Sequence, residues 1–401
     1  MEGTRTGRRR LGVFGHRDPG ALRARWEALA RSGKASKSRC RTWGLLFVLF
    51  VSGLMRPQPL RQMLPPPQEV LTTNPKVGVH TRLTDEVEAW KIQASLAMVR
   101  EMGAPWIVEY FPWAYIEPEP DRFTWEHSDA VISHAENQGL TVIARLGMVP
   151  EWARPDPREM ETTFTYLAPE RYADFASFVG AFVSRYRDPV VAIIVWNEPN
   201  LSFEWGYRPV DPAAYVALLR AVTPAAHAAN PEVVVLGGAL APTLEPPGSA
   251  AGLNDLVYLE EMYKNGVSAY FDALAAHAYG LAFAPEIAPA EDVINFRRIE
   301  LLRGIMDAYG DSQKEIYVTE AGWNDHPRWA WAVLPGERVR FTLDAYAWAA
   351  DHWPWCPVVA MWMFRTPQPL YNYQDYYAFV TPDFQALPIY TGVQTYTGNA
   401  D

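Results

Sequence analysis

The sequence predicts a (β/α)8 barrel, in which eight parallel strands alternate with helices and close into a cylinder. Eight short runs rich in Val and Ile are separated by longer stretches of helical character, an alternation typical of a parallel sheet covered by helices. All eight runs lie within residues 76–401, a length that suits one barrel domain. A doubly wound open sheet is the alternative, but no Gly-x-Gly-x-x-Gly turn follows any of the runs.

The eight predicted strands are placed by their apolar character. They cover residues 76–80, 105–111, 140–146, 190–196, 232–240, 270–279, 315–320 and 357–364. Among the predicted helices, residues 85–103 end at Gly103, because glycine commonly terminates a helix. A second helix is predicted over residues 169–187.

The residues before the barrel divide into three segments. Residues 1–42 carry 12 Lys and Arg against 3 Asp and Glu and form a basic lead that we expect to be disordered. The apolar segment 43–55, WGLLFVLFVSGLM, fits the core of a signal peptide better than a membrane span, which needs about 20 residues. An uncleaved anchor and a helix buried in the domain are the alternatives. Residues 56–75 are rich in proline and predict an extended linker. Because the apolar segment 43–55 indicates export, we expect an extracellular or cell-surface protein.

Charge and composition exclude several classes of function. Outside the basic lead the chain carries 24 basic and 43 acidic residues, which argues against binding of nucleic acid. Cys40 and Cys356 are its two cysteines, and we expect neither a structural disulfide nor a zinc site. No cofactor-binding or metal-binding cluster is visible, so no cofactor is predicted. The 16 Trp and 20 Tyr suit core packing and also stacking on sugars.

Two predicted strands end in a glutamate. The fourth continues through Ile194 and Trp196 into WNEPN, and strict alternation places both residues on the same side as Glu198. The seventh continues through residues 316–318 to Glu320 in TEAGW, 122 residues further on. Active sites of (β/α)8 barrels lie at the carboxyl ends of the strands. We therefore expect the two carboxylates to face each other across the barrel mouth.

A pair of carboxylates that flanks a cavity is what hydrolysis of a glycosidic bond needs. One carboxylic acid protonates the leaving oxygen, while the other carboxylate attacks the anomeric carbon or activates a water. Their separation decides the stereochemistry, at about 5–5.5 Å for retention and more for inversion. The sequence therefore predicts a carbohydrate substrate and leaves the distance open.

The motifs WNEPN and TEAGW resemble those of the clan A glycoside hydrolases, which are retaining (β/α)8 enzymes, and the chain looks nearest to family 39 and cellulase-like members. The resemblance covers about residues 76–395. It implies that Glu198 is the acid/base, that Asn197 donates to the sugar 2-hydroxyl and that Glu320 is the nucleophile. The implied activity is hydrolysis of β-linked oligo- or polysaccharides by double displacement. A transglycosylase with the same site and a non-catalytic glycan-binding barrel are the alternatives.

The same resemblance suggests further substrate-binding residues at other strand ends. His80 closes the first predicted strand, His277 and Tyr279 end the sixth, and Trp362 in the eighth matches a tryptophan under the cleaved sugar. Tyr279 is expected to hold the nucleophile carboxylate by a hydrogen bond. The loop residues expected to stack on sugar are Trp113, Trp152 and Trp323. Ordinary core packing is the alternative for all of these side chains.

One position departs from the clan pattern. Many members carry an arginine on the second strand that contacts the nucleophile, whereas the matching segment WIVEYFPW has no arginine and contains Glu109. A third carboxylate in the site would favour protonation of its neighbours through like-charge repulsion. Binding of a sugar hydroxyl and an outward orientation toward a helix are the other interpretations of Glu109.

Overall fold

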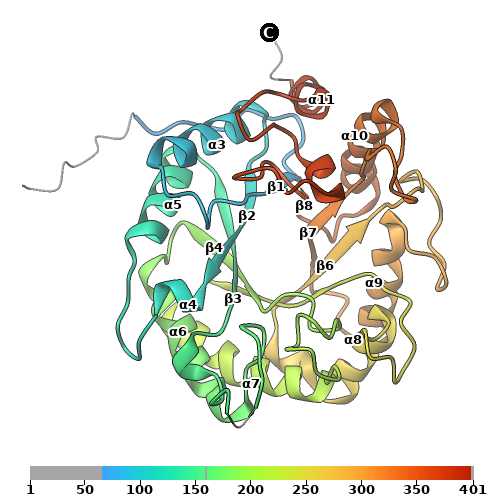
Figure 1. Ribbon diagram of the computed structural model, residues 1–401. Helices are drawn as coiled ribbons and strands as arrows, with labels where there is room; N and C mark the ends of the chain where they lie inside the picture. The colour runs from blue at the N-terminus through green and yellow to red at the C-terminus, as the bar shows by residue number, and fades with distance from the viewer. Residues whose placement is uncertain (1–65, 159, 399–401) are drawn as a thin grey trace, which may run out of the picture. The chain divides into compact units, whose positions relative to one another are not determined.

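The computed structural model describes residues 66–158 and 160–398 and contains the predicted barrel (Figure 1). Eight parallel strands pair in chain order, and β8 pairs with β1 to close the barrel. The (β/α)8 prediction is confirmed, and the doubly wound sheet is excluded. The basic lead and the apolar segment 43–55 lie outside the described residues. Within the part of the chain that the structure describes, no helix is long and apolar enough to cross a membrane.

Each strand overlaps one of the predicted segments. The strands are β1 (Val77–His80), β2 (Trp106–Pro112), β3 (Thr141–Gly147), β4 (Val190–Val195), β5 (Val234–Leu240), β6 (Ala273–Tyr279), β7 (Ile316–Gly322) and β8 (Val359–Met361). β8 is shorter than predicted, but Trp362 beyond its end still donates its backbone N–H to Ala321 in β7.

Helices surround the strands, as Figure 1 shows. They are α3 (Ala89–Glu101), α5 (Glu126–Asn137), α6 (Tyr172–Arg185), α7 (Pro212–Ala229), α8 (Asp255–Lys264), α9 (Ile299–Ala308), α10 (Pro335–His352) and α11 (Pro388–Tyr396). Shorter helical turns are α4 (Trp113–Ile116), η1 (Glu151–Ala153), η2 (Pro169–Arg171), η3 (Val267–Tyr270), η4 (Phe296–Arg298) and η5 (Tyr373–Tyr377). Gly103 follows α3 with φ of 77°, a conformation that glycine adopts without steric cost.

Residues 66–75, the described part of the predicted linker, make hydrogen bonds to the barrel. Gln68 donates its backbone N–H to the carbonyl of Asn137 at 2.7 Å. Asn74 is buried, and its side-chain amide donates to the carbonyl of Tyr346 in α10 at 3.2 Å. Proline content predicted an extended chain here but could not show that its last residues find hydrogen-bond partners on the barrel.

The strands bury side chains in two layers. Ile194 belongs to the layer inside the barrel, together with Ile143 and Leu236 from neighbouring strands. Ile193 and Val195, on either side of Ile194, belong to the larger layer between strands and helices. Each fully buried Val or Ile contributes about 1.5–3 kcal/mol, so both layers stabilise the frame that carries the strand ends.

The alternation predicted for the end of β4 is wrong. Trp196 packs against Trp205 in the outer layer and does not join Ile194 inside the barrel. The backbone leaves the extended conformation here, because Trp196 has φ of 73° and Glu198 has φ of 41°. A period of two holds only for extended residues. The turn, not the alternation, therefore brings Glu198 to the mouth.

A register shift near the end of β7 directs Glu320 to the mouth. Ile316 and Val318 belong to the outer layer, so uninterrupted alternation would direct Glu320 toward the helices. Ala276 in β6 pairs with Val318, whereas the next residue, His277, pairs with Glu320. The extra residue in β7 reverses the side on which the following side chains lie.

Candidate active site

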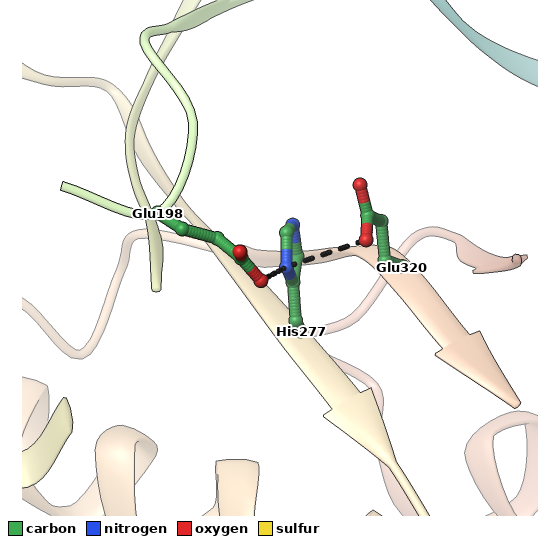
Figure 2. A group of neighbouring side chains, drawn as sticks. All are labelled: Glu198, His277 and Glu320. Carbon is green, nitrogen blue, oxygen red and sulfur yellow. Dashed lines mark hydrogen bonds and ion pairs between the residues drawn. The ribbon is translucent and has the colours of Figure 1, made fainter. Parts of the chain in front are cut away.

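Glu198 and Glu320 converge at the mouth, on either side of His277 from β6 (Figure 2). His277 Nδ1 lies 2.7 Å from Glu198 Oε1 and 3.6 Å from Glu320 Oε2. One carboxylate oxygen of each glutamate lies within 4.8 Å of the other. The strand ends therefore bring together the two carboxylates that the motifs predict.

The carboxylate of Glu320 is enclosed by donors. Tyr279 OH donates to Oε2 at 2.8 Å, as predicted, and Arg145 Nη1 donates to Oε1 at 3.1 Å. The residue is 6% exposed. An unpaired buried charge costs several kcal/mol, so these partners are what allows a carboxylate at this depth.

Arg145 was not singled out from the sequence, yet it is the arginine of the site. It lies on β3 and not on the second strand, and its guanidinium lies 4.5 Å from the centre of the Tyr110 ring in β2. A signal was available in VIARLG, because alternation places Arg145 on the same side as Ile143, which faces the barrel interior. The expected arginine contact to the nucleophile is thus made from a neighbouring strand.

Glu109 is turned away from the mouth. Its carboxylate accepts hydrogen bonds from the hydroxyls of Thr81 at 2.6 Å and Thr84 at 2.9 Å. It also accepts from the backbone N–H groups of Leu83 and Tyr110, both at 3.0 Å. These bonds tie the loop after β1 to β2. The hydrogen bonds of Glu109 thus hold the loop after β1, and Glu109 is not among the residues that line the pocket with Glu198 and Glu320.

His277 joins the two glutamates and does not line the pocket, which corrects its prediction as a substrate-binding residue. Burial alone would lower its pKa, but the charge of Glu320 and the hydrogen bond to Glu198 outweigh burial and raise the pKa of His277. A raised pKa favours a ring that donates to a carboxylate. His277 thus holds the geometry of the pair.

His80 is enclosed beneath the site. Burial and the charge of Arg145 lower its pKa well below the usual range, so the ring is neutral at pH 7. Nδ1 donates to the carbonyl of Thr81 at 2.7 Å, which leaves Nε2 as an acceptor 3.8 Å from Glu320 Oε1. The side chain has no exposed surface, so the predicted sugar contact is not made directly. His80 instead contacts Trp362 edge-on at 4.6 Å and supports it.

Glu198 and Glu320 line a pocket of about 480 Å³. Of the predicted substrate-binding residues, Asn197, Tyr279 and Trp362 line it. Lining residues that the motifs did not indicate include Arg145, Phe203, Glu204, Trp329, Tyr373 and Tyr377. Trp329 and Tyr373 stack nearly in parallel, with ring centres 5.1 Å apart. Trp329, Tyr373 and Tyr377 come from the segments after β7 and β8, and Phe203 comes from the loop after β4. The sequence could not predict the shape of these loops.

Three predicted sugar-stacking tryptophans lie outside the pocket. Trp113 and Trp323 are 0% and 1% exposed, and their indole N–H groups donate to Glu117 and to the carbonyl of Phe283. Trp152 is half-buried, donates to the carbonyl of Glu117 and lines a separate hollow. Sugar stacking is excluded for Trp113 and Trp323, because both rings are closed inside the core.

Asn197 lies between Arg145 and Glu204. Its Oδ1 accepts from Arg145 Nη1 at 3.0 Å, and its Nδ2 donates to Glu204 Oε1 at 3.2 Å. Burial raises the pKa of Glu204 to about 7, and the negative charge of Glu198 acts in the same direction. The site thus holds a third carboxylate, which in the sequence follows WNEPN by only a few residues.

Glu198, His277 and Glu320 also present three atoms close enough together to share a metal ion. In the structure two of these groups are already joined, because His277 Nδ1 donates to Glu198 Oε1. A metal ion would have to displace this bond and would compete with Tyr279 and Arg145 for Glu320. The donor set suits acid–base chemistry better than metal binding.

Comparisons with known proteins agree with the resemblance seen in the motifs. The family model of glycoside hydrolase family 42, described as beta-galactosidase, matches residues 84–162, a stretch that contains neither Glu198 nor Glu320. The sequence matches no curated protein.

Solved structures of glycoside hydrolases share the fold. A family 39 enzyme from the gut symbiont Bacteroides cellulosilyticus WH2 is 20% identical, with a TM-score of 0.65 over 81% of this chain and 63% of that chain. A family 39 enzyme from Xanthomonas axonopodis pv. citri is 16% identical, with a TM-score of 0.58 over 84% of this chain and 71% of the other. A family 5 subfamily 18 protein from Streptomyces cattleya, in complex with GlcNAc, is 15% identical, with a TM-score of 0.59 over 81% of this chain and 80% of that one. The chain is similar in fold to glycoside hydrolases of families 39 and 5.

Proposed function

We propose that this protein is a retaining glycoside hydrolase that cleaves β-linked O-glycosidic bonds in oligo- or polysaccharides. The observation that carries the proposal is the approach of Glu198 and Glu320, with one oxygen of each within 4.8 Å of the other. An inverting enzyme separates its carboxyl groups by about 6.5–9.5 Å to admit a water between them. The spacing here favours direct attack by one carboxylate.

The proposed reaction is a double displacement. A carboxylate oxygen of Glu320 attacks the anomeric carbon, the bond from that carbon to the leaving oxygen breaks, and Glu198 gives its proton to that oxygen. Glu198 then takes a proton from a water whose oxygen attacks the anomeric carbon. The ester bond to Glu320 breaks and releases the Glu320 carboxylate, while Glu198 keeps the proton taken from the water.

The neighbouring side chains support these two roles. Arg145 and Tyr279 hold the carboxylate of Glu320 by one hydrogen bond to each oxygen, which fixes the direction of attack. Asn197 lines the pocket next to Glu198 and is proposed to donate to a hydroxyl of the bound sugar, the 2-hydroxyl by resemblance to the clan. Trp362 offers an indole surface, and such surfaces stack on the apolar face of a sugar ring.

The pocket suits more than a single small ligand. Its volume of about 480 Å³ lies within the usual range for ligand sites, and the stacked rings of Trp329 and Tyr373 form part of its wall. An oligosaccharide segment is therefore the proposed occupant. A panel of aryl β-glycosides would identify the sugar that is cleaved. The panel should include a β-galactoside because the matching family model describes beta-galactosidases.

The test combines activity with stereochemistry. Wild-type protein should hydrolyse at least one aryl β-glycoside, with the β-anomer as first product by NMR, and Glu320→Ala should abolish turnover while keeping the same circular dichroism spectrum. An α-anomer as first product, or an active Glu320→Ala variant, would contradict the proposal. Transfer of sugar to an added acceptor in preference to water would assign a transglycosylase. Binding of glycans without turnover of any substrate would assign a glycan-binding protein.

We also propose that the chain is exported through residues 43–55. The support is the length of this apolar segment and its basic flank. Cell fractionation and amino-terminal sequencing of the mature protein would test it. Release with a new amino terminus after residue 55 indicates a cleaved signal, and recovery in the membrane fraction with residues 43–55 intact indicates an anchor. An intact protein in the cytoplasmic fraction would contradict export.

A further inference from the structure

Glu204 is a carboxylate in the catalytic pocket to which double displacement gives no task. It lies in the loop after β4 and lines the same pocket as Glu198 and Glu320. Burying a carboxylate has a cost that is tolerated where the group has a partner and a use. Its hydrogen-bond partner in the structure is Asn197.

The loop holds Glu204 in a defined place. The indole N–H of Trp196 donates to the backbone carbonyl of Glu204 at 2.8 Å. The next residue, Trp205, is buried against Trp196, and its backbone N–H bonds to the carbonyl of Leu201 at 3.1 Å. The position of this carboxylate is therefore set by the core behind it.

The side chain of Asn197 is held at both ends. Arg145 donates to its Oδ1, and Glu204 accepts from its Nδ2. An amide side chain rotates easily about its last torsion, and its oxygen and nitrogen ends differ only in hydrogen bonding. Arg145, which can only donate, and Glu204, which accepts, therefore favour the same orientation, with the oxygen toward Arg145 and the nitrogen toward Glu204. One N–H of Nδ2 remains for another acceptor.

We propose that Glu204 is a positioning residue that fixes the amide of Asn197, so that the remaining N–H of Nδ2 is presented to a hydroxyl of the bound sugar. This inference rests on the proposed function, because it needs a glycoside in the pocket. Direct contact between Glu204 and the sugar is the rival arrangement, since the hydrogen bond to Asn197 uses only Oε1.

The first experiment compares three variants by kcat/KM on an aryl β-glycoside that the wild type hydrolyses. Glu204→Ala should lose about tenfold, the order expected when a buried donor is left without its acceptor. Glu204→Gln keeps an oxygen that can accept from Asn197 and should stay within about threefold. Glu232→Ala, an exposed glutamate just before β5, is the control and should match the wild type. A Gln variant as poor as the Ala variant would overturn the proposal.

The second experiment tests whether Glu204 acts through Asn197. Two separate measurements of kcat/KM are made. The first adds Glu204→Ala to the Asn197→Ala variant, and the second compares Glu204→Ala with the wild type on a substrate that lacks the 2-hydroxyl. In each case Glu204→Ala should lower kcat/KM by less than about twofold, because coupled residues show non-additive losses. If Glu204→Ala lowers kcat/KM in both measurements as much as it does in the wild type on the full substrate, the proposal is overturned in favour of direct contact between Glu204 and the sugar. Melting temperatures within a few degrees of the wild type separate these effects from unfolding. A wild type inactive on the whole panel would overturn the proposed function as well, whereas an active wild type with additive losses overturns only this inference.

Discussion

The ends of β7 and β4 hold their glutamates in different ways. Glu320 lies within the strand, its side chain is 7% exposed, and both of its oxygens accept hydrogen bonds, from Arg145 and Tyr279. Glu198 lies beyond the last residue of β4, and its side chain is 14% exposed. Among the described residues, the hydrogen bond that its carboxylate makes comes from His277. An enclosed carboxylate suits a nucleophile that must be fixed, and a more accessible one suits an acid/base that exchanges a proton in each step.

The largest expected effects follow from replacing Glu320 and Glu198 themselves. Glu320→Gln should lower kcat by about 10⁴-fold or more for every substrate, because no other group can form the covalent bond. Glu198→Gln should cost about 10²–10⁴-fold for glycosides whose leaving group needs a proton, and much less for nitrophenyl glycosides. The measurement is kcat for a series of leaving groups of different acidity. The dependence of log kcat on the acidity of the leaving group should differ between the two variants. The same dependence for both would contradict the assignment of Glu320 as nucleophile and Glu198 as acid/base.

The next effect concerns the side chains that enclose Glu320. Arg145→Met removes the charged donor but keeps an unbranched side chain. It should lower kcat by about 100-fold, since losing one preorganised charged contact has this order of effect. Tyr279→Phe removes a single hydroxyl donor and should cost about tenfold. Steady-state kinetics on one substrate give both values. If Tyr279→Phe proves more damaging than Arg145→Met, the arginine is not the main partner of the nucleophile.

A smaller effect is the pH dependence of the free energy of unfolding that the buried carboxyl group of Glu204 causes. Burial raises the pKa of Glu204 from 4.5 to about 7, so the folded state holds this proton more tightly than the unfolded state. Stability therefore falls as pH rises from 4.5 to about 7, and the cost is fully present above that range. Glu204→Gln should raise the free energy of unfolding at pH 8 by up to about 3 kcal/mol and change it little at pH 4.

Urea denaturation at the two pH values measures this difference. The matched control is Glu232→Gln, an exposed glutamate that should show no difference between pH 4 and pH 8. An equal change for Glu204→Gln at both pH values would contradict the burial of its carboxylate.

The smallest expected effect concerns Trp329, which stacks on Tyr373 in the pocket wall. If this stacked pair binds a sugar next to the cleaved one, Trp329→Ala should raise KM for oligosaccharides by about two- to tenfold. The same variant should leave an aryl monosaccharide unaffected. An equal rise in KM for both substrates would place Trp329 at the cleaved sugar.

The fold and the meeting of Glu198 and Glu320 at the barrel mouth could be predicted because both depend on local pattern. Apolar runs alternating with helices specify a barrel, and two strands that end in glutamate specify a mouth with two carboxylates. Arg145 was also within reach, because it continues the inward side that Ile143 begins on β3. The resemblance did not indicate it, because the clan pattern has its arginine on the second strand, where this chain has Glu109 bonded to the loop after β1.

Other features depend on backbone irregularities and on loops. The φ values of Trp196 and Glu198 and the shifted pairing in β7 end the period of two where it matters for the site. Trp113 begins α4 directly after β2 and is closed into the core against Phe178, which its surroundings in the sequence do not indicate. The place of Glu204 depends on the path of the loop after β4, which is held by tertiary contacts.

The central claim is that Glu320 forms the covalent bond to the sugar. The most direct measurement is inactivation by a 2-deoxy-2-fluoro β-glycoside with a dinitrophenyl leaving group, followed by peptide mapping of the labelled protein by mass spectrometry. We expect one sugar per chain, attached to Glu320, with activity recovering as the label is hydrolysed. A label on Glu198 or Glu204, or turnover of the reagent by an active enzyme with no labelled peptide at any stage, would contradict it.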